Sequence, residues 1–230
     1  MGNGVIKMEQ LLTANVATNL YWLGRYIERI EATLGQIMIA YDQIIDVDKN
    51  AGITLYENFS TELEYTNAKD FLQKAIFGEH AANIAVLAGY ARENAIICRN
   101  HINTQAFGEI IALNALFQKS SNSFVDIDYK LIDEAGSLIS EMWGEISKTE
   151  YKRISDYFLR LGQLIEKADF NFRFDEEKET GIIIIDEINK ILANLEADKE
   201  TNVEQTQTQE MDYEVIINNI HKKIQDLIID

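Results

Sequence analysis

Apolar residues recur at alternating steps of three and four along the first part of the chain. Between about Asn15 and Asp46 they are Leu20, Leu23, Ile27, Ile30, Leu34, Ile37, Tyr41 and Ile44. This spacing predicts one helix with a continuous apolar stripe, lying along its neighbours at a shallow angle as in a bundle. Trp22 and Tyr26 lie off the stripe, which predicts that a second face of this helix is also buried.

The same periodicity predicts further helices downstream, over residues 81–101, 105–118, about 128–146 and 148–172. Shorter helices are expected within residues 47–80, with breaks near Gly52, Asn67 and Gly78. Residues 119–123 have the composition of a loop, and Asp126 or Asp128 suits the cap of the next helix. Ser147 and Glu150 have the spacing of a capping box, which predicts the start of the helix over 148–172.

The last quarter of the chain predicts a smaller helical unit. Residues 182–195 begin with four isoleucines, which allows a strand, but their apolar positions keep a helical step and favour a helix. Residues 196–211 are acidic and polar and predict a flexible linker. Ile216, Ile220, Ile224 and Leu227 share one side of a final amphipathic helix.

These elements together predict an all-α bundle of long antiparallel helices with a C-terminal helical appendage. The chain contains no proline, which permits long uninterrupted helices. Residues 175–230 hold 15 acidic and 5 basic residues, a net charge of −10 out of −17 for the chain. We therefore expect a main body over residues 1–174 and an acidic appendage over residues 175–230.

The acidic balance argues against nucleic acid and anionic membrane surfaces as partners, because both are bound through basic faces. It suits a basic protein partner or a cationic substrate, or it serves solubility alone. The single Cys98 fits a reducing compartment, and the sequence shows neither a signal peptide nor a membrane span. We expect a cytoplasmic protein.

Metal and nucleophile chemistry have little support in the residue pattern. None of His80, His101 and His221 belongs to a Glu-x-x-His or His-Glu-x-x-His motif, and the single cysteine allows no cysteine pair, so no metal site is expected. Cys98 shares a stripe with Ala91 and Ala95, which predicts a buried and inert thiol. No nucleophile with an adjacent base is evident, so catalytic residues remain unknown.

The charged part of the first helix is the strongest candidate for a site. Arg25, Glu28 and Arg29 lie within one helical turn of one another, and Gly24 beside them permits close approach of another helix or a ligand. Residues 23–31 also match residues 161–169 in hydrophobic class, glycine position and charge sign, which suggests two related helices. Two readings stay open at this point, an ion-pair network that sets helix register and a polar pocket for a charged ligand.

Three segments give the chain a recognisable resemblance. Residues 19–31, with Glu28-Arg29, closely resemble the opening helix of the alpha-E family, a bacterial all-helical family named for its Glu-Arg signature. Residues 91–95 resemble its middle motif and residues 158–169 its closing helix, so the resemblance covers roughly residues 11–174. The closing helix departs from the family pattern, since Gln163 and Lys167 stand where arginine is usual.

The resemblance implies a role beside ATP-grasp amide ligases and transglutaminase-like peptidases. It implies a helical partner or substrate-binding subunit of an ATP-dependent peptide or amide ligase, with a peptide or amino acid as substrate. The chain has no glycine-rich phosphate loop, so ATP and Mg are expected only on the ligase partner and no cofactor on this chain. The alternative is a non-catalytic interaction module that docks through its acidic C-terminal helices.

The hypothesis assigns a polar cluster drawn from three helices. Its members are Arg25, Glu28, Arg29, Arg92, Glu93, Arg160, Glu166 and Lys167. In it Arg25, Arg29 and Arg92 hold carboxylate or phosphate groups. Glu28, Glu93 and Glu166 orient these bases or receive an amine.

Overall fold

A computed structural model describes residues 12–121, 128–148, 153–174, 178–197 and 213–229 of the chain. Over these ranges the regular structure is helical and contains no strand, which confirms the all-α prediction. The helices are α1 (Ala14–Asp46), α2 (Ala51–Glu57), α3 (Ala68–Phe77), α4 (Ile84–Ile97), α5 (Thr104–Ser121), α6 (Tyr129–Ser147), α7 (Ile154–Arg173), α8 (Lys178–Ala197) and α9 (Tyr213–Ile229).

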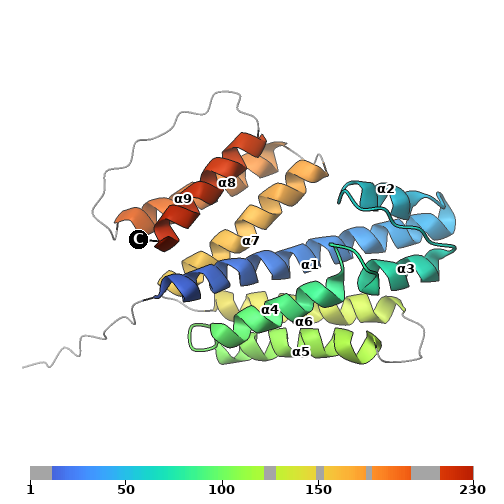
Figure 1. Cartoon of the computed structure of the whole chain (residues 1–230), viewed down its shortest axis with the longest axis horizontal. Coiled ribbons are helices and arrows are strands. Elements are labelled where there is room, and N and C mark those ends of the chain that lie inside the picture. Colours follow the sequence, from blue (N-terminus) through green and yellow to red (C-terminus); the bar gives the residue numbers. More distant parts are fainter. Residues whose placement is uncertain (1–11, 122–127, 149–152, 175–177, 198–212, 230) are drawn as a thin grey trace, which may run out of the picture.

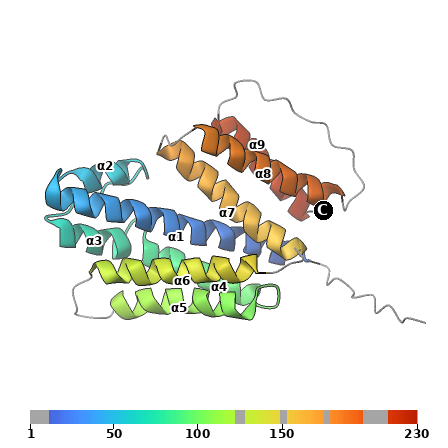
Figure 2. The same cartoon turned by 180° about the vertical axis from the view of Figure 1, so that it is seen from behind.

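The long helix α1 is the axis about which the other helices are arranged (Figure 1). Helices α4, α5 and α6 run along one side of α1, and α7 crosses its other side obliquely. Helices α8 and α9 lie beyond α7, while α2 and α3 pack at the C-terminal end of α1, as the reverse view also shows (Figure 2). The charged part of α1 therefore lies where α7 crosses it.

The apolar stripe of α1 forms the centre of the core. Leu23, Ile27, Ile30 and Ile37 are completely buried, as the periodicity predicts. The expected burial of a second face is wrong for Trp22, which keeps 38 % of its surface exposed. Tyr26 is partly buried and packs against the core. No described helix is both long enough and apolar enough to cross a membrane.

Two of the predicted helix boundaries need correction. The break expected near Gly52 lies at residues 47–50, and Gly52 itself lies inside α2. An added Cβ at Gly52 would lie 2.5 Å from the Phe71 ring, so packing requires glycine there. Helix α7 begins at Ile154 instead of near Lys148, with Arg153 as its cap. The Asp156 carboxylate accepts from the Arg153 backbone N–H, and this pair supplies the capping box assigned to residues 147 and 150. Residue 150 lies outside the described residues.

Other local predictions agree with the structure. Asp128 caps α6 by accepting a hydrogen bond from the Lys130 backbone N–H at 3.0 Å. One departure is that helix α5 runs to Ser121, three residues into the segment 119–123 for which a loop was predicted. Cys98 is buried with Ala91 and Ala95, and burial raises the pKa of its thiol to about 12.

The C-terminal segment folds onto the body as helices. Residues 182–195 are helical, and Ile188 and Leu192 of α8 belong to the same hydrophobic core as α1 and α7. Ile220 and Ile224 of α9 join this core. The predicted linker lies mostly outside the described residues. The division at residue 174 stays a prediction, but α8 beyond it packs on α7.

Candidate functional site

The two related segments meet where α1 and α7 cross. At Gly24 an added Cβ would lie 2.1 Å from the carbonyl oxygen of Leu159, and at Gly162 it would lie 2.0 Å from that of Tyr21. Each distance is far below van der Waals contact, so only glycine allows the two backbones to approach this closely. Gly24 and Gly162 align in the sequence match, and Tyr21 and Leu159 each lie three residues before the aligned glycine. The two helices therefore cross about a local two-fold axis.

The first half of the crossing is a buried carboxylate held by two arginines. Glu166 of α7 is 1 % exposed, and its Oε2 accepts a hydrogen bond from Arg25 Nε at 2.8 Å. Its Oε1 accepts a hydrogen bond from Arg29 Nε. Both arginines come from α1 and lie one turn apart, which brings both guanidinium groups to one carboxylate. Charge-assisted hydrogen bonds of this kind fix the orientation of the guanidinium planes.

The second half repeats this arrangement with weaker partners. Glu28 of α1 is 4 % exposed and accepts a hydrogen bond from Gln163, while Lys167 Nζ lies 3.8 Å from its Oε2, too far for a hydrogen bond. Its Oε2 has no hydrogen-bond partner. Burial, only partly offset by Lys167 and Gln163, raises the pKa of Glu28 to about 7. The departures at 163 and 167 thus leave Glu28 poorly compensated.

Arg160 extends the cluster towards α8. Its Nη1 donates to the Gln163 side-chain oxygen at 2.6 Å, and its Nε donates to Glu187 at 2.8 Å. Because the Gln163 oxygen accepts from Arg160, its amide group is oriented to donate to Glu28. Arg160 therefore acts on the cluster through Gln163.

The groups that pair directly at the crossing are net positive within an acidic chain. Arg25, Arg29 and Lys167 supply +3, and Glu166 supplies −1. Glu28 adds 0 when protonated or −1 when ionised, so the five groups that pair directly at the crossing sum to +2 or +1.

Asp169 beside Arg25 is paired with Arg173 and adds no net charge. Glu31 beside Glu28 adds −1. The cations of the crossing are therefore only partly offset, in a chain that carries −17 as a whole. This arrangement favours an anionic group as ligand.

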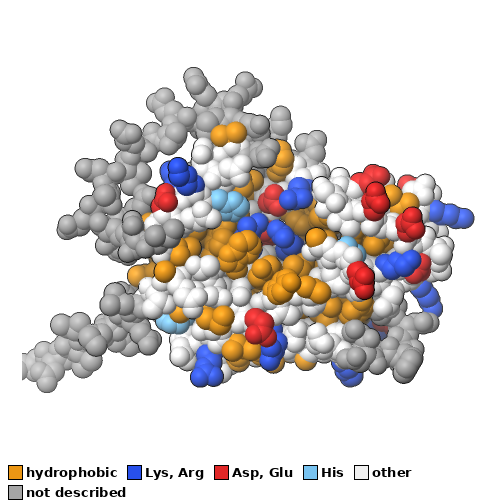
Figure 3. Space-filling model, in the orientation of Figure 1, with side chains coloured by type: hydrophobic (Ala, Val, Ile, Leu, Met, Phe, Trp, Pro, Cys, Tyr) orange, Lys and Arg blue, Asp and Glu red, His pale blue; other side chains and the backbone are white. Residues whose placement is uncertain are grey.

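An aromatic surface adjoins the arginines. The Arg25 guanidinium carbon lies 4.9 Å from the centroid of the Trp22 ring, a cation–π distance. Trp22 contacts Tyr26 with ring centroids 5.7 Å apart, and Tyr26 contacts Tyr90 of α4 at 5.6 Å. Figure 3 shows hydrophobic side chains gathered over α1 and α4 in the middle of this face, with basic side chains beside them. The sequence did not predict that Trp22 and Tyr90 would be exposed, or that they would belong to one surface.

The part of the predicted cluster on α4 lies apart from the salt bridges of the crossing. Arg92 and Glu93 are on α4, where Arg92 Nη1 pairs with Glu93 Oε1. Their side chains are 39 % and 65 % exposed. The structure thus brings together six of the eight predicted residues, namely Arg25, Glu28, Arg29, Arg160, Glu166 and Lys167. That the eight residues form one ligand site stays a prediction.

His221 is a contact of the cluster that sequence reasoning missed. Its Nε2 lies 3.4 Å from Arg25 Nη1, and its ring meets the Tyr21 ring edge-on at 6.3 Å. The available signal was its position, since residue 221 lies four after Ile217 and three before Ile224 on the buried side of α9. Burial and the neighbouring Arg25 charge lower the pKa of His221.

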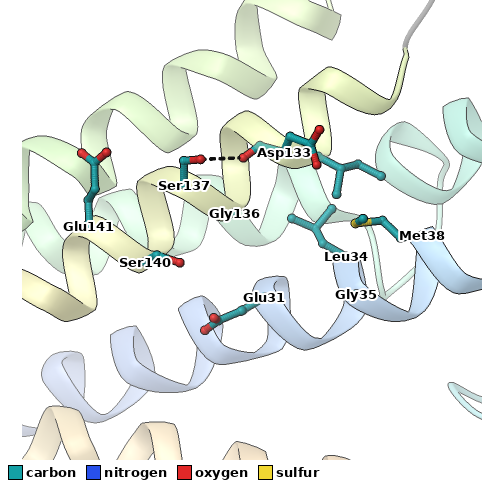
Figure 4. A pocket seen from close by; sticks show the side chains of 10 residues that line it. Glu31, Leu34, Gly35, Met38, Asp133, Gly136, Ser137, Ser140 and Glu141 are labelled. Carbon is teal, nitrogen blue, oxygen red and sulfur yellow. Dashed lines mark hydrogen bonds between the residues drawn. The ribbon is translucent and has the colours of Figure 1, made fainter.

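A separate cleft of about 540 Å³ lies between α1 and α6 (Figure 4). Glu31, Asp133 and Glu141 contribute carboxylates to it, and Glu31 also accepts a hydrogen bond from Trp143 Nε1 at 3.2 Å. The cleft is lined by residues of α1 and α6, whereas the ion pairs of the charge cluster join α1 to α7. Helices α6 and α7 lie on different sides of α1 (Figures 1 and 2). Across the described ranges, no group of three or more His, Cys, Asp or Glu side chains is placed to hold a metal ion.

Comparison with known proteins identifies the domain. Residues 12–197 match the model of Alpha-E, described as a predicted alpha-helical domain with a conserved ER motif. No curated protein and no solved structure matches the chain. Glu28-Arg29, at the α1–α7 crossing, is an ER pair within the matched range, and α9 lies beyond that range. The chain belongs to the Alpha-E family.

Proposed function

We propose that this chain is the helical, substrate-binding partner of an ATP-dependent peptide or amide ligase of the ATP-grasp type. In this proposal the cluster at the α1–α7 crossing receives a carboxylate of a peptide or amino-acid substrate. The observation that supports it most is the pair Arg25 and Arg29 held by the buried Glu166. A ligase must present a carboxylate in a fixed position to ATP, and oriented guanidinium groups suit that task.

The arginines keep donors for a ligand after binding Glu166. Each guanidinium has five N–H donors, and both arginines use Nε for Glu166. Arg29 is 32 % exposed, so its side chain reaches the surface. A ligand carboxylate paired with Arg29 lies beside the cationic side chains of Arg25 and Arg29, whose charge Glu166 only partly offsets, and is therefore electrostatically favoured.

The aromatic surface gives the substrate a second contact. Trp22 and Tyr90 are 38 % and 51 % exposed, and Tyr26 connects them. Tryptophan, tyrosine and arginine are the side chains that contribute most to protein and peptide recognition. We assign the substrate carboxylate to the arginines and its adjoining residues to these rings.

ATP and Mg bind on the ligase in this proposal. The chain carries no Gly-x-x-x-x-Gly-Lys loop, and its role is to position the substrate. A transglutaminase-like protein is a second expected partner in the same system.

Glu28, with a pKa of about 7, is a group of the cluster able to take up or release a proton near neutral pH as an anion binds or leaves.

The proposal is tested by reconstitution with an ATP-grasp ligase that co-purifies with the tagged chain. We expect peptide-dependent ADP release to require this chain and to fall at least tenfold with Arg29→Gln. The control is Arg99→Gln, the same chemical change in an exposed arginine just beyond the end of α4. ADP release that is the same with and without the chain would overturn the proposal.

One observation favours the alternative, a non-catalytic interaction module. Ile182 and Ile183 of α8 are 53 % and 67 % exposed, which is unusual for paired isoleucines on an acidic helix. Replacing both by Gln leaves the buried face of α8 intact. Loss of partner recovery with this variant, and its retention with Arg29→Gln, would support docking through the C-terminal helices.

A further inference from the structure

Helix α9 lies over the charge cluster although it is outside the family match. The match ends at residue 197, and α9 begins at Tyr213. It packs on both α1 and α7, the two helices that build the crossing. Figure 1 shows α9 beside α7, above the N-terminal half of α1, and Figure 3 shows a histidine on this face close to basic side chains. An element outside the matched range thus contacts Arg25 and Tyr21 of the helix that carries the ER pair.

The contact uses a donor that a ligand would need. Arg25 Nε is bound to Glu166, and Arg25 Nη1 faces His221 Nε2 at 3.4 Å. Since arginine donates, His221 Nε2 accepts and the imidazole is neutral with its proton on Nδ1. With α9 in place the Arg25 side chain is only 12 % exposed. His221 therefore occupies one hydrogen-bond donor of Arg25 and limits the access of a ligand to this side chain.

Among the side chains that the structure describes, few attach α9, a helix of 17 residues. Of these, Ile217, Ile220 and Ile224 are buried, at 8 %, 5 % and 1 % exposure, and Leu227 and Ile228 are partly buried. Val215 at its start is 47 % exposed. A helix that rests on few buried contacts opens at a lower free-energy cost than the core helices.

We propose that α9 is a displaceable cover, and that His221 competes with the substrate carboxylate for Arg25. This inference rests on the proposed carboxylate site and adds its regulation. A carboxylate makes a charge-assisted hydrogen bond to arginine, which is stronger than the neutral histidine contact it replaces. Ligand binding and release of α9 are then coupled, so that each favours the other.

The cover also responds to acid. The groups that face His221 are Arg25 and Tyr21 from α1, and Glu166 and Asp169 from α7. Protonation of His221 removes the acceptor for Arg25 and places a second cation beside it. Burial and Arg25 hold the pKa of docked His221 below 6.5, so released α9 binds the proton more tightly. Docking is therefore strongest above pH 6.5 and weakens as the pH falls below that value.

The test compares Ile224→Asp with Gln225→Asp in the full chain. Both place one new carboxylate on α9, but Ile224 is 1 % exposed whereas Gln225 is exposed, so only the first expels the helix. The probe is N-acetyl-trialanine with a free carboxylate, and its Kd is measured by calorimetry at pH 7.5. We expect Ile224→Asp to bind the probe at least tenfold more tightly than wild type, and Gln225→Asp to match wild type.

Two further arms separate the possible failures. His221→Ala keeps the isoleucine contacts, so it serves if Ile224→Asp does not fold, and we expect a gain of about threefold. At pH 5.5 the affinity ratio between Ile224→Asp and wild type should shrink. If wild type, Ile224→Asp and His221→Ala bind the probe with equal affinity, the proposal that α9 covers the site is wrong. The proposed carboxylate site is not contradicted by that result. If none of the proteins binds the probe, the proposed carboxylate site fails and the cover with it.

Discussion

Glu28 and Glu166 occupy equivalent positions on two crossing helices, but they have unequal partners. Glu166 is bound by Arg25 and Arg29, whereas Glu28 has Gln163 and a lysine amine at 3.8 Å. Both carboxyl groups are buried, at 1 % and 4 % exposure respectively. Because of this asymmetry, Glu166 holds two arginines in place, whereas the pKa of Glu28 is raised to about 7.

The first prediction concerns pH. The pKa of Glu28 is about 7 in the folded chain and 4.5 in a free side chain, so the folded state binds this proton more tightly. Its contribution to stability is therefore complete below pH 4.5 and is lost as the pH rises through 7, a change of about 3 kcal/mol at 1.36 kcal/mol per unit. Denaturant unfolding of wild type and Glu28→Gln across this range measures it. A constant difference between the two proteins would contradict the prediction.

A second prediction restores the missing symmetry. Replacing both Gln163 and Lys167 by Arg gives Glu28 the same pair of partners that Glu166 has. We expect the pKa of Glu28 to fall well below 7, because two guanidinium groups stabilise its charged form. Carbon-13 NMR titration of the Glu28 carboxyl reports this directly. If the pKa of Glu28 stays near 7 in the folded variant, the two new arginines do not contact Glu28 as Arg25 and Arg29 contact Glu166, and the prediction is wrong.

The third prediction compares two glutamates. Glu166→Ala leaves two arginines without their buried partner, and we expect a loss of about 3–5 kcal/mol in the free energy of unfolding. Glu93→Ala removes an exposed partner of Arg92, and a loss of no more than about 1 kcal/mol is expected. Urea denaturation of both variants gives the two values. Similar losses would place Glu93 in the same network as Glu166.

The helix crossing gives a fourth prediction. Gly24→Ala puts a methyl group 2.1 Å from the Leu159 carbonyl oxygen, and neither backbone can move without separating α1 from α7. We expect a loss of about 3 kcal/mol or more in thermal stability.

Gly35→Ala is the matched control in the same helix. Nothing lies within 4 Å of the added methyl group, so the change should stabilise the chain by about 1 kcal/mol through helix propensity. A Gly24→Ala variant with a melting temperature equal to that of Gly35→Ala would rule out the close crossing.

Periodicity was enough to predict most of the fold. The stripe from Leu20 to Ile44 identified α1 within one residue at its N-terminus, and the match between residues 23–31 and 161–169 indicated two related helices. The start of α7 was missed because the cap uses Arg153, which lacks the short side chain that marks most caps. Gly52 was misjudged because its reason is tertiary, the approach of the Phe71 ring.

The site was less predictable than the fold. Helical spacing showed that Arg25 and Arg29 share a face, but only the packing of α7 on α1 showed that both reach Glu166. The exposure of Trp22 and the docking of His221 depend on which neighbours cover α1. For His221, helical spacing could indicate the buried side of α9, but the identity of its partner Arg25 depends on how distant parts of the chain pack.

The central claim is that the crossing binds a carboxylate, and one titration tests it most directly. N-acetyl-trialanine with a free carboxylate and the same peptide as its C-terminal amide are titrated into wild type and Arg29→Gln. We predict that wild type binds the acid at least tenfold more tightly than the amide and that this difference disappears in Arg29→Gln. Equal affinity of folded wild type for the acid and the amide would contradict the claim.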